Sequence, residues 1–375
     1  MRKRVVPLAV IALGLLASCG KVYSSVTAGD GDFSFSFNEY KDIDIHTDLQ
    51  NQYLNDSIES VETYARGYEE VSKPNDLEIT WEFKTFDSKR VSLYTFYLSE
   101  SEDMINPLVY EYDDTTATLS NLKVGTTYYY QIEAEAGNHK YKSTVQSFNT
   151  LSTTPRNLDI GGVTNARDMG GYTTSDGKHV KQNMVIRSGQ FNERYTDSLT
   201  PTISGKGKEF LRDVVGIRTE LDLRTVDDGE TGHMEHLGKS LIGNDVKYVS
   251  LPLENEISKT HINEKEQFKN IFKVFADEKS YPIVFHCAIG TDRTGVTAYF
   301  LGALLGLDHD TLCRDYLFSN FGLINGTRNL DNPKIYNKYL MGLEGATLKE
   351  KTYNYFLDIG MTSSELDNIR SILLY

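Results

Sequence analysis

The stretch HCAIGTDRTG at residues 286–295 decides the fold of this part of the chain. The short apolar run at 282–285 before it is typical of a buried strand, and the apolar segment at 294–305 is typical of a buried helix. Upstream patterning predicts strands at 184–186, 217–223 and 246–251 and an amphipathic helix at 265–275. Strands that alternate with helices indicate an α/β domain, in which the polar stretch forms a loop between a strand and a helix.

Cys287 and Arg293 stand six positions apart in this loop, with Gly290 between them. A loop of this length can curl so that successive N–H groups point inward at a helix N-terminus, which favours an anion. Phosphate fits such a cradle, and Arg293 can hold two of its oxygens in a bidentate geometry that lysine cannot match. The same groups stabilise a thiolate, so Cys287 is the predicted nucleophile.

The rest of the stretch completes the predicted site. The phosphate-binding loop comprises Ala288, Ile289, Gly290, Thr291, Asp292 and Arg293. Thr294 is predicted to donate a hydrogen bond to the Cys287 sulfur and to help it leave in the second step. His286 is expected to orient the loop from behind, because its side chain follows a buried strand.

Three upstream segments accompany the loop: NARDMGGY at 165–172, IRSG at 186–189 and ELDLRT at 220–225. In this order they resemble a bacterial subgroup of secreted, dual-specificity-like enzymes of the protein tyrosine phosphatase superfamily. The resemblance covers residues 155–375, including LDIGM at 357–361. It implies a central, mostly parallel sheet flanked by helices, a cysteinyl-phosphate intermediate, action on phosphotyrosine and in some members on phosphoinositides, and no metal or cofactor.

Departure of a phenolate, whose pKa is about 10, needs a proton from a placed acid. In the resembled subgroup the acid is the loop aspartate beside the arginine, which is Asp292 here. In the wider superfamily it lies on a separate loop, which by position falls near Glu254 and Glu256. We favour Asp292 and leave the two glutamates open.

Other functions compete with protein phosphotyrosine hydrolysis. A phosphoinositide or inositol phosphate phosphatase is one alternative, although Thr291 stands where many relatives carry a lysine suited to multiply phosphorylated lipids. A sulfur transferase also uses a loop cysteine, but the Arg-Thr-Gly at 293–295 fits a phosphatase better. A non-catalytic surface module that binds phosphorylated ligands is the alternative from another class, against which the intact Cys287 and Arg293 argue.

The first residues have the form of an export signal. Arg2, Lys3 and Arg4 precede an apolar run at 5–17 that is too short to span a bilayer comfortably. LASC at 16–19 resembles a bacterial lipobox, which predicts a lipoprotein signal peptide at 1–18 and lipidation of Cys19. We therefore expect an exported protein that is anchored to the membrane, with its catalytic domain outside the cytoplasm.

Charge and cysteine content narrow the partners. Loss of residues 1–18 removes three positive charges and no negative ones, so the formal net charge changes from −14 to −17. Such an acidic surface repels nucleic acid, and a phosphorylated protein or a small phosphate monoester is the expected partner. The sequence does not decide whether Cys287 and Cys313 form a disulfide.

The region before residue 155 has a different pattern. Residues 19–71 are polar and uneven, which predicts a tether and lead-in. Residues 72–152 alternate with period two, which predicts an all-β domain. In this segment Tyr128 stands six residues after Leu122, as in the tyrosine corner of fibronectin type III sandwiches, and Trp81 stands where that family buries its core tryptophan. The segment Ser152-Thr153-Thr154-Pro155 is predicted to be the linker.

Overall fold

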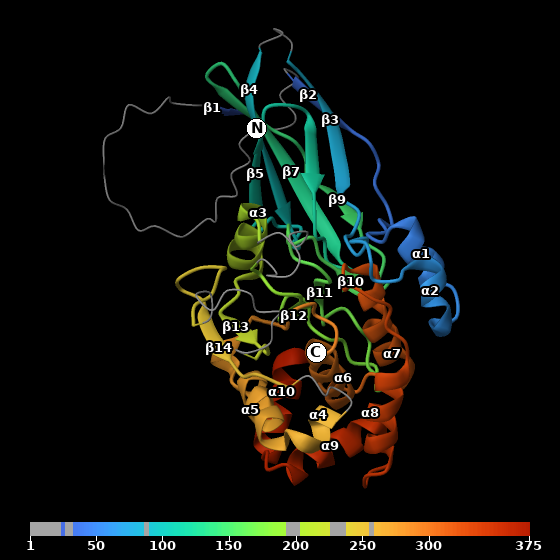
Figure 1. Ribbon diagram of the computed structural model, residues 1–375. Coiled ribbons are helices and arrows are strands. Elements are labelled where there is room, and N and C mark those ends of the chain that lie inside the picture. Colours follow the sequence, from blue (N-terminus) through green and yellow to red (C-terminus); the bar gives the residue numbers. More distant parts are fainter. Residues whose placement is uncertain (1–23, 27–32, 86–89, 193–202, 226–237, 255–258) are drawn as a thin grey trace. The chain divides into compact units, whose positions relative to one another are not determined.

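A computed structural model of the chain describes residues 24–26, 33–85, 90–192, 203–225, 238–254 and 259–375 (Figure 1). The chain divides into two compact units. The first unit comprises residues up to 45 together with 75–152, and the second comprises 46–74 together with 153–375. Each unit is therefore built from two separate segments of the chain.

The first unit consists of two β-sheets that share one core. The smaller sheet has the order β2 (Phe33–Phe37), β3 (Leu77–Thr85), β6 (Thr116–Leu119). The larger sheet has the order β1 (Ser24–Val26), β8 (His139–Lys142), β7 (Thr127–Ala136), β4 (Val91–Ser99), β5 (Leu108–Tyr112), and β9 (Gln146–Asn149) also pairs with β7. The rings of Trp81 and Phe96, from different sheets, pack with their centroids 6.1 Å apart. The predicted all-β pattern is confirmed here.

Two details of this unit support the predicted resemblance to fibronectin type III. The backbone N–H of Lys123 donates a hydrogen bond to the Tyr128 hydroxyl over 2.8 Å, which is the contact of a tyrosine corner. Trp81 is buried in the core between the sheets. The family of this sandwich stays a prediction.

The structure corrects the prediction of a tether at 19–71 where that segment is described. Phe33–Phe37 forms β2, which pairs with β3 and joins the first unit. Residues 46–74 carry α1 (Asp48–Leu54), η1 (Ile58–Ser60) and α2 (Val61–Tyr64) and belong to the second unit. The prediction fails because a few apolar anchors, such as the buried Tyr53 and Val61, decide the packing although the segment is polar on average.

The second unit is built on a mixed sheet with four parallel strands (Figure 1). Its order is β10 (Arg156–Asn157), β11 (Arg167–Asp168), β12 (Val185–Ser188), β15 (Ile283–His286), β13 (Thr219–Asp222), β14 (Lys247–Ser250). Strands β12, β15, β13 and β14 are parallel, and β10 and β11 are antiparallel additions at one edge. The predicted strands are confirmed, and so is the mostly parallel sheet.

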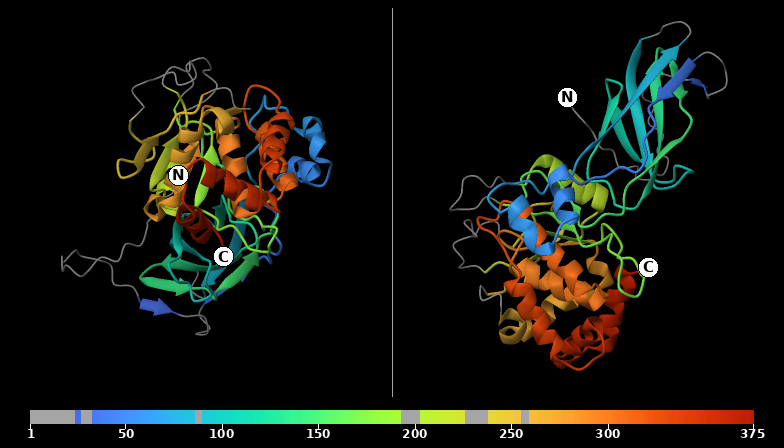
Figure 2. Two further views of the ribbon diagram at one scale, coloured as in Figure 1. Left: turned by 90° about the horizontal axis from the view of Figure 1, so that it is seen from below. Right: turned by 90° about the vertical axis from the view of Figure 1, so that its right-hand side faces the viewer.

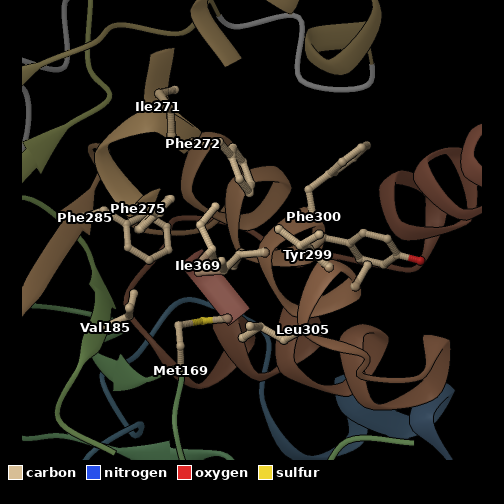
Figure 3. Close-up of a cluster of buried hydrophobic side chains, with 14 of the residues drawn as sticks. Met169, Val185, Ile271, Phe272, Phe275, Phe285, Tyr299, Phe300, Leu305 and Ile369 are labelled. Carbon is tan, nitrogen blue, oxygen red and sulfur yellow. The ribbon is translucent and has the colours of Figure 1, made fainter. Parts of the chain in front are cut away.

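Helices cover both faces of this sheet. Successive strand residues point to opposite faces, so neighbouring residues of one strand pack against different helices. Ile186 and Val284 join a cluster with η2 (Phe210–Val215), which directly continues the short helix α3 (Gly205–Glu209). Val185 and Phe285 join the larger cluster with the helices on the other face (Figure 3). The helices on this face, whose ribbons are also drawn in Figure 2, are α4 (Thr260–Asn263), α5 (Lys265–Ala276), α6 (Arg293–Leu305), α7 (His309–Leu317), α8 (Asp331–Met341), α9 (Leu348–Asp358) and α10 (Ser363–Leu373), with the short turns η5 (Glu278–Ser280) and η6 (Phe318–Phe321). The predicted helices at 265–275 and 294–305 are thus α5 and α6.

Every residue of α6 is buried, which places this helix in the middle of the second unit. Only six residues separate its first residue, Arg293, from the end of the central strand β15 at His286. In parallel sheets, ligands usually bind at the loops that follow the carboxyl ends of the strands. In the described part of the chain, no helix has both the length and the apolarity to cross a bilayer.

Candidate functional site

The loop 287–292 connects the end of β15 to the start of α6, as the sequence predicts. Cys287 is its first residue and is 1% exposed. Arg293 is the first residue of α6 and is also buried. The strand–loop–helix geometry therefore places the candidate nucleophile at the base of a loop that ends at a helix N-terminus.

Three successive carbonyl groups of this loop point outward. The contacts are Gln190 N–H to Ala288 O (3.1 Å), Asn165 Nδ2–H to Ile289 O (3.0 Å) and Arg187 Nη2–H to Gly290 O (3.0 Å). The C=O and N–H of a trans peptide point in opposite directions, so the N–H groups that follow these carbonyls face the inside of the loop. This arrangement is a cradle of donors that suits an anion.

Gly290 is required by two features of the loop. Its φ is +71°, in the left-handed region that favours glycine. A Cβ atom at this position would lie 2.4 Å from the Ser188 carbonyl carbon, which leaves no room for a side chain. The loop thus packs directly on the backbone after β12.

The Thr291 side chain faces the protein interior. Its hydroxyl accepts a hydrogen bond from Asn165 Nδ2 over 3.1 Å, and the residue is fully buried. Asn165 thereby ties together two points of the loop, since it also donates to the Ile289 carbonyl. Position 291 stiffens the cradle and adds no positive charge to it.

A buried ionic network that the sequence analysis missed supports the loop from below. Asp315, on α7, accepts hydrogen bonds from Arg187 Nη1 and, over 2.8 Å, from Arg167 Nε. Arg167 also donates to Asn165 Oδ1, and Arg187 donates to the Gly290 carbonyl. The two arginines brace the loop, but their shared carboxylate lies 148 residues after Arg167 and 128 after Arg187, and it has no local signal in the sequence.

The pKa values of this network follow from burial and charge. Burial would raise the pKa of Asp315, but Arg167 and Arg187 outweigh it and lower the pKa to about 2. Burial and the neighbouring Arg167 lower the pKa of Arg187 to about 10, while Asp315 and Cys287 oppose this shift. Arg187 therefore places a positive charge beside the loop, where it also donates to the Gly290 carbonyl.

His286 lies behind the loop, in agreement with its predicted role. Its Nε2 is 3.1 Å from Glu220 Oε1, and the side chain is fully buried. Next to it, the Asp222 carboxylate accepts hydrogen bonds from Arg224, among them one from Nε over 2.9 Å and one from Nη2 over 2.6 Å. Burial would raise the pKa of Asp222, but His286 and Arg224 lower it to about 2, which indicates a permanently ionised structural pair.

Thr294 is fully buried at the start of α6, and its hydroxyl has no hydrogen-bond partner within the described residues. Buried hydroxyls are usually paired, so this one calls for a partner that the described residues do not supply. The donation to the Cys287 sulfur stays a prediction.

Asp292, the favoured acid, is held by an arginine that the sequence analysis did not identify. Arg328 Nε and Nη2 donate to its two carboxylate oxygens over 3.0 and 2.8 Å. Burial alone would lower the pKa of Arg328, but Asp292 outweighs it and the pKa is raised. Both side chains are about one quarter exposed, so the pair faces solvent at the outer end of the loop.

The other acid candidates lie after β14. Glu254 is exposed, and its backbone N–H donates to Glu264 Oε2 over 3.0 Å. Glu256 lies outside the described residues. Burial raises the pKa of Glu264, while the hydrogen bond from Glu254 and the charge of Arg293 act in the opposite direction. Glu264, a half-buried carboxyl with a raised pKa that accepts a hydrogen bond from Glu254, is a further acid candidate that only the structure reveals.

Cys287 and Cys313 are both free thiols. The Cys313 sulfur is 3.5 Å from His309 Nε2, and burial raises the pKa of this thiol to about 12. Cys313 is thus an inert core residue, and the open question of a disulfide is answered against one.

Comparisons with known proteins agree with this geometry. A family model described as "Tyrosine phosphatase family" matches residues 158–375. A tyrosine-protein phosphatase of Nostoc commune is 24% identical over 120 residues, which are 28% of this chain and 41% of that protein. A candidate tyrosine-protein phosphatase of Cupriavidus necator is 24% identical over 184 residues, which are 42% of this chain and 61% of that protein. The chain thus spans less than two thirds of the length of either relative.

Among solved structures, the core catalytic domain of the PP-IP phosphatase SIW14 from S. cerevisiae is 16% identical, with a TM-score of 0.30. The match covers 44% of this chain and 86% of that one. Another structure of the Siw14 catalytic core is 14% identical, with a TM-score of 0.28, over 42% of this chain and 80% of that one. At these scores the likeness carries no argument about the substrate.

Proposed function

The chain belongs to the tyrosine phosphatase family, and we propose that it hydrolyses phosphate monoesters, with protein phosphotyrosine as the main substrate. The observation that carries the proposal is the loop whose carbonyls are bound from outside, so that the N–H groups of the same peptides face the inside of the loop. Arg293 begins α6 at the end of the same loop and completes the phosphate cradle.

The reaction has two steps. The Cys287 thiolate attacks phosphorus, an S–P bond forms, the ester P–O bond breaks, and the leaving oxygen takes a proton from an acid. Water then attacks the cysteinyl phosphate, the S–P bond breaks, inorganic phosphate leaves and the acid regains a proton. We assign to the Thr294 hydroxyl the stabilisation of the sulfur as it departs, because this buried hydroxyl has no hydrogen-bond partner among the described residues.

Two features favour phosphotyrosine. Cys287 is 1% exposed, so a phosphate must reach it on a long arm, and the phenol ring of phosphotyrosine is longer than the arm of phosphoserine. The buried Thr291 adds no second positive group for a multiply phosphorylated lipid or inositol. Inositol phosphates are therefore the alternative that the substrate test has to exclude.

Asp292 is our first choice for the acid. Its carboxylate ends the loop and faces solvent, where a leaving group would depart. Its pairing with Arg328 is an obstacle, because protonation would weaken two charge-assisted hydrogen bonds. Glu254, Glu256 and Glu264 are the other candidates for this role.

We also propose that the protein acts outside the cytoplasm, held at the membrane by a lipid on Cys19. The proposal rests on the basic start, the apolar run and the lipobox-like LASC of residues 1–19, which lie outside the described residues. The predicted phosphorylated partner would then be an extracytoplasmic protein or phosphate monoester.

The proposal is tested by measuring the inorganic phosphate that the full chain releases from four kinds of substrate. These are phosphotyrosine peptides, phosphoserine peptides, phosphoinositides and inositol phosphates. We expect the highest kcat/KM with phosphotyrosine peptides, and rapid quenching followed by peptide mapping should find phosphate on Cys287. A higher kcat/KM with inositol phosphates would refute phosphotyrosine as the main substrate. No hydrolysis of any of these esters by an intact chain would refute the proposed phosphatase activity.

A further inference from the structure

The family match begins at residue 158, but the second unit also contains residues 46–74, which we call the strap. The strap packs on residues 316–330, which comprise the end of α7 and the segment that follows it. The Tyr53 ring lies 5.8 Å from Phe318 and 5.7 Å from Phe321, centroid to centroid, and Arg314 lies over its face. The strap is therefore part of the core beneath this segment.

Hydrogen bonds from backbone and side-chain groups join the strap to the same segment. The contacts are Gly67 N–H to Asn320 O (2.8 Å), Val71 N–H to Phe321 O (2.7 Å), Ile324 N–H to Gly67 O (2.9 Å), Leu323 N–H to Glu70 Oε2 (3.1 Å) and the Thr327 hydroxyl to Arg66 O (3.1 Å). Three of these five bonds join backbone to backbone, and together the five hold the path of residues 320–327.

This path leads to the phosphate loop through Arg328. The Asn320 side chain clamps the backbone of Arg328, since its Oδ1 accepts the Arg328 N–H over 2.7 Å and its Nδ2 donates to the Arg328 carbonyl over 3.0 Å. Arg328 in turn holds both carboxylate oxygens of Asp292. Gly67 is thus three hydrogen-bonded links away from the outer end of the loop.

A second path reaches the other side of the loop. Gly322 packs so tightly on Asn165 that a Cβ at Gly322 would lie 2.8 Å from the Asn165 Cβ. The Thr164 hydroxyl also donates to the Leu323 carbonyl over 3.4 Å. Asn165 binds the Ile289 carbonyl and the Thr291 hydroxyl, so the segment under the strap supports the loop at two places.

We infer that the strap is a positioning segment of the catalytic site, which sets Arg328 against Asp292 and thereby the geometry of the phosphate loop. The inference rests on the proposed phosphatase function. It gives the catalytic unit an essential part that lies before the β-sandwich strands β3–β9 in the chain and outside the region that the family shares.

Gly67→Ala in the full chain tests the inference, with Gly177→Ala as the matched control. Both glycines have positive φ, +77° and +80°, so both substitutions strain the backbone alike. A Cβ at Gly67 would lie 2.6 Å from the Gly326 carbonyl oxygen, whereas no atom lies within 4 Å of a Cβ at Gly177. We expect kcat for a phosphotyrosine peptide to fall about tenfold or more in the first variant, since small displacements in a catalytic site are costly. The control should stay within about twofold of wild type.

The same substitution in an Arg328→Ala background shows whether the effect passes through Arg328. If it does, Gly67→Ala should cause little further loss there, because the two changes disrupt one path. Equal losses in both backgrounds, or unchanged activity of Gly67→Ala, would overturn the inference. If Gly67→Ala does not fold, Glu70→Ala removes the bond to the Leu323 N–H without a clash and should show the same dependence on Arg328.

Calorimetric binding of inorganic phosphate separates this inference from the proposed function. We expect Gly67→Ala to bind phosphate more weakly than wild type and Gly177→Ala to bind it equally. If the wild-type chain binds phosphate but hydrolyses no ester, the proposed phosphatase function is refuted. The effect of the strap can then still be measured as the difference in phosphate affinity between Gly67→Ala and wild type. A wild-type chain that binds no phosphate would overturn both.

Discussion

The buried network at Asp315 offers the sharpest prediction about stability. Asp315→Asn keeps the shape of the side chain but removes the charge that Arg167 and Arg187 share. Both guanidinium groups are at most 1% exposed, so water cannot replace the lost carboxylate. An amide has one oxygen and one NH2 group, and in either orientation the NH2 faces one of the two arginine donors.

The size of the effect follows from this burial. Loss of one partner of a buried ion pair costs about 3–5 kcal/mol. For a unit of this size each kcal/mol lowers Tm by about 2–4 °C, so a decrease of about 10 °C is expected. The activity should fall as well, because Arg187 also binds the Gly290 carbonyl of the phosphate loop.

Scanning calorimetry of the full chain at pH 7 measures this change, and Asp213→Asn is the matched control. Asp213 also forms a bidentate pair, with Arg212, but the arginine is 42% exposed, so about 1 kcal/mol or less is at stake. If Asp315→Asn melts within about 2 °C of this control, the network does not carry the stability that we assign to it.

The pH dependence provides an independent check. The pKa of Asp315 is lowered from 3.8 to about 2 in the folded protein. Its stabilising contribution is therefore complete above about pH 4 and is lost as the pH falls towards 2. Asp315→Asn should lack this part of the acid unfolding profile, and an unchanged profile would contradict the assignment.

Four further predictions concern the reaction, the anchor and the strap. Cys287→Ser should abolish turnover but keep phosphate binding, because a serine hydroxyl is not ionised near neutral pH, and activity within about tenfold of wild type would exclude Cys287 as the nucleophile. Asp292→Asn should slow phosphotyrosine hydrolysis by about 10²–10⁴ but affect an aryl phosphate with an acidic leaving phenol far less; equal losses would point to a structural role. Cys19→Ser should release the protein from the membrane fraction of the producing cell, whereas a variant that stays lipidated would contradict the lipobox. A shortened chain that starts at residue 155 lacks the strap and should melt lower and turn over more slowly than the full chain; equal values would show that the strap is dispensable.

Sequence by itself determined the centre of the site, because its parts are contiguous. Strand β15, the loop from Cys287 and helix α6 are encoded within about 25 residues by an apolar run, a spaced Cys and Arg, and a second apolar run. Period and composition also placed the parallel strands within two residues of their observed bounds. Hydrophobic burial and local hydrogen bonding act within such short segments, so the order of apolar and polar residues in the sequence indicates the secondary structure.

Tertiary structure alone decided which side chains hold that centre in place. Asp315 meets Arg167 from 148 positions away, and Glu70 meets the Leu323 N–H from 253 positions away. A lone aspartate or glutamate on a helix or loop has no pattern that names its partner, because the partner is chosen by how the sheet and helices pack. The strap escaped prediction for the same reason: its polar composition suggests a tether, and its role comes from a few buried rings and backbone bonds to a segment far along the chain.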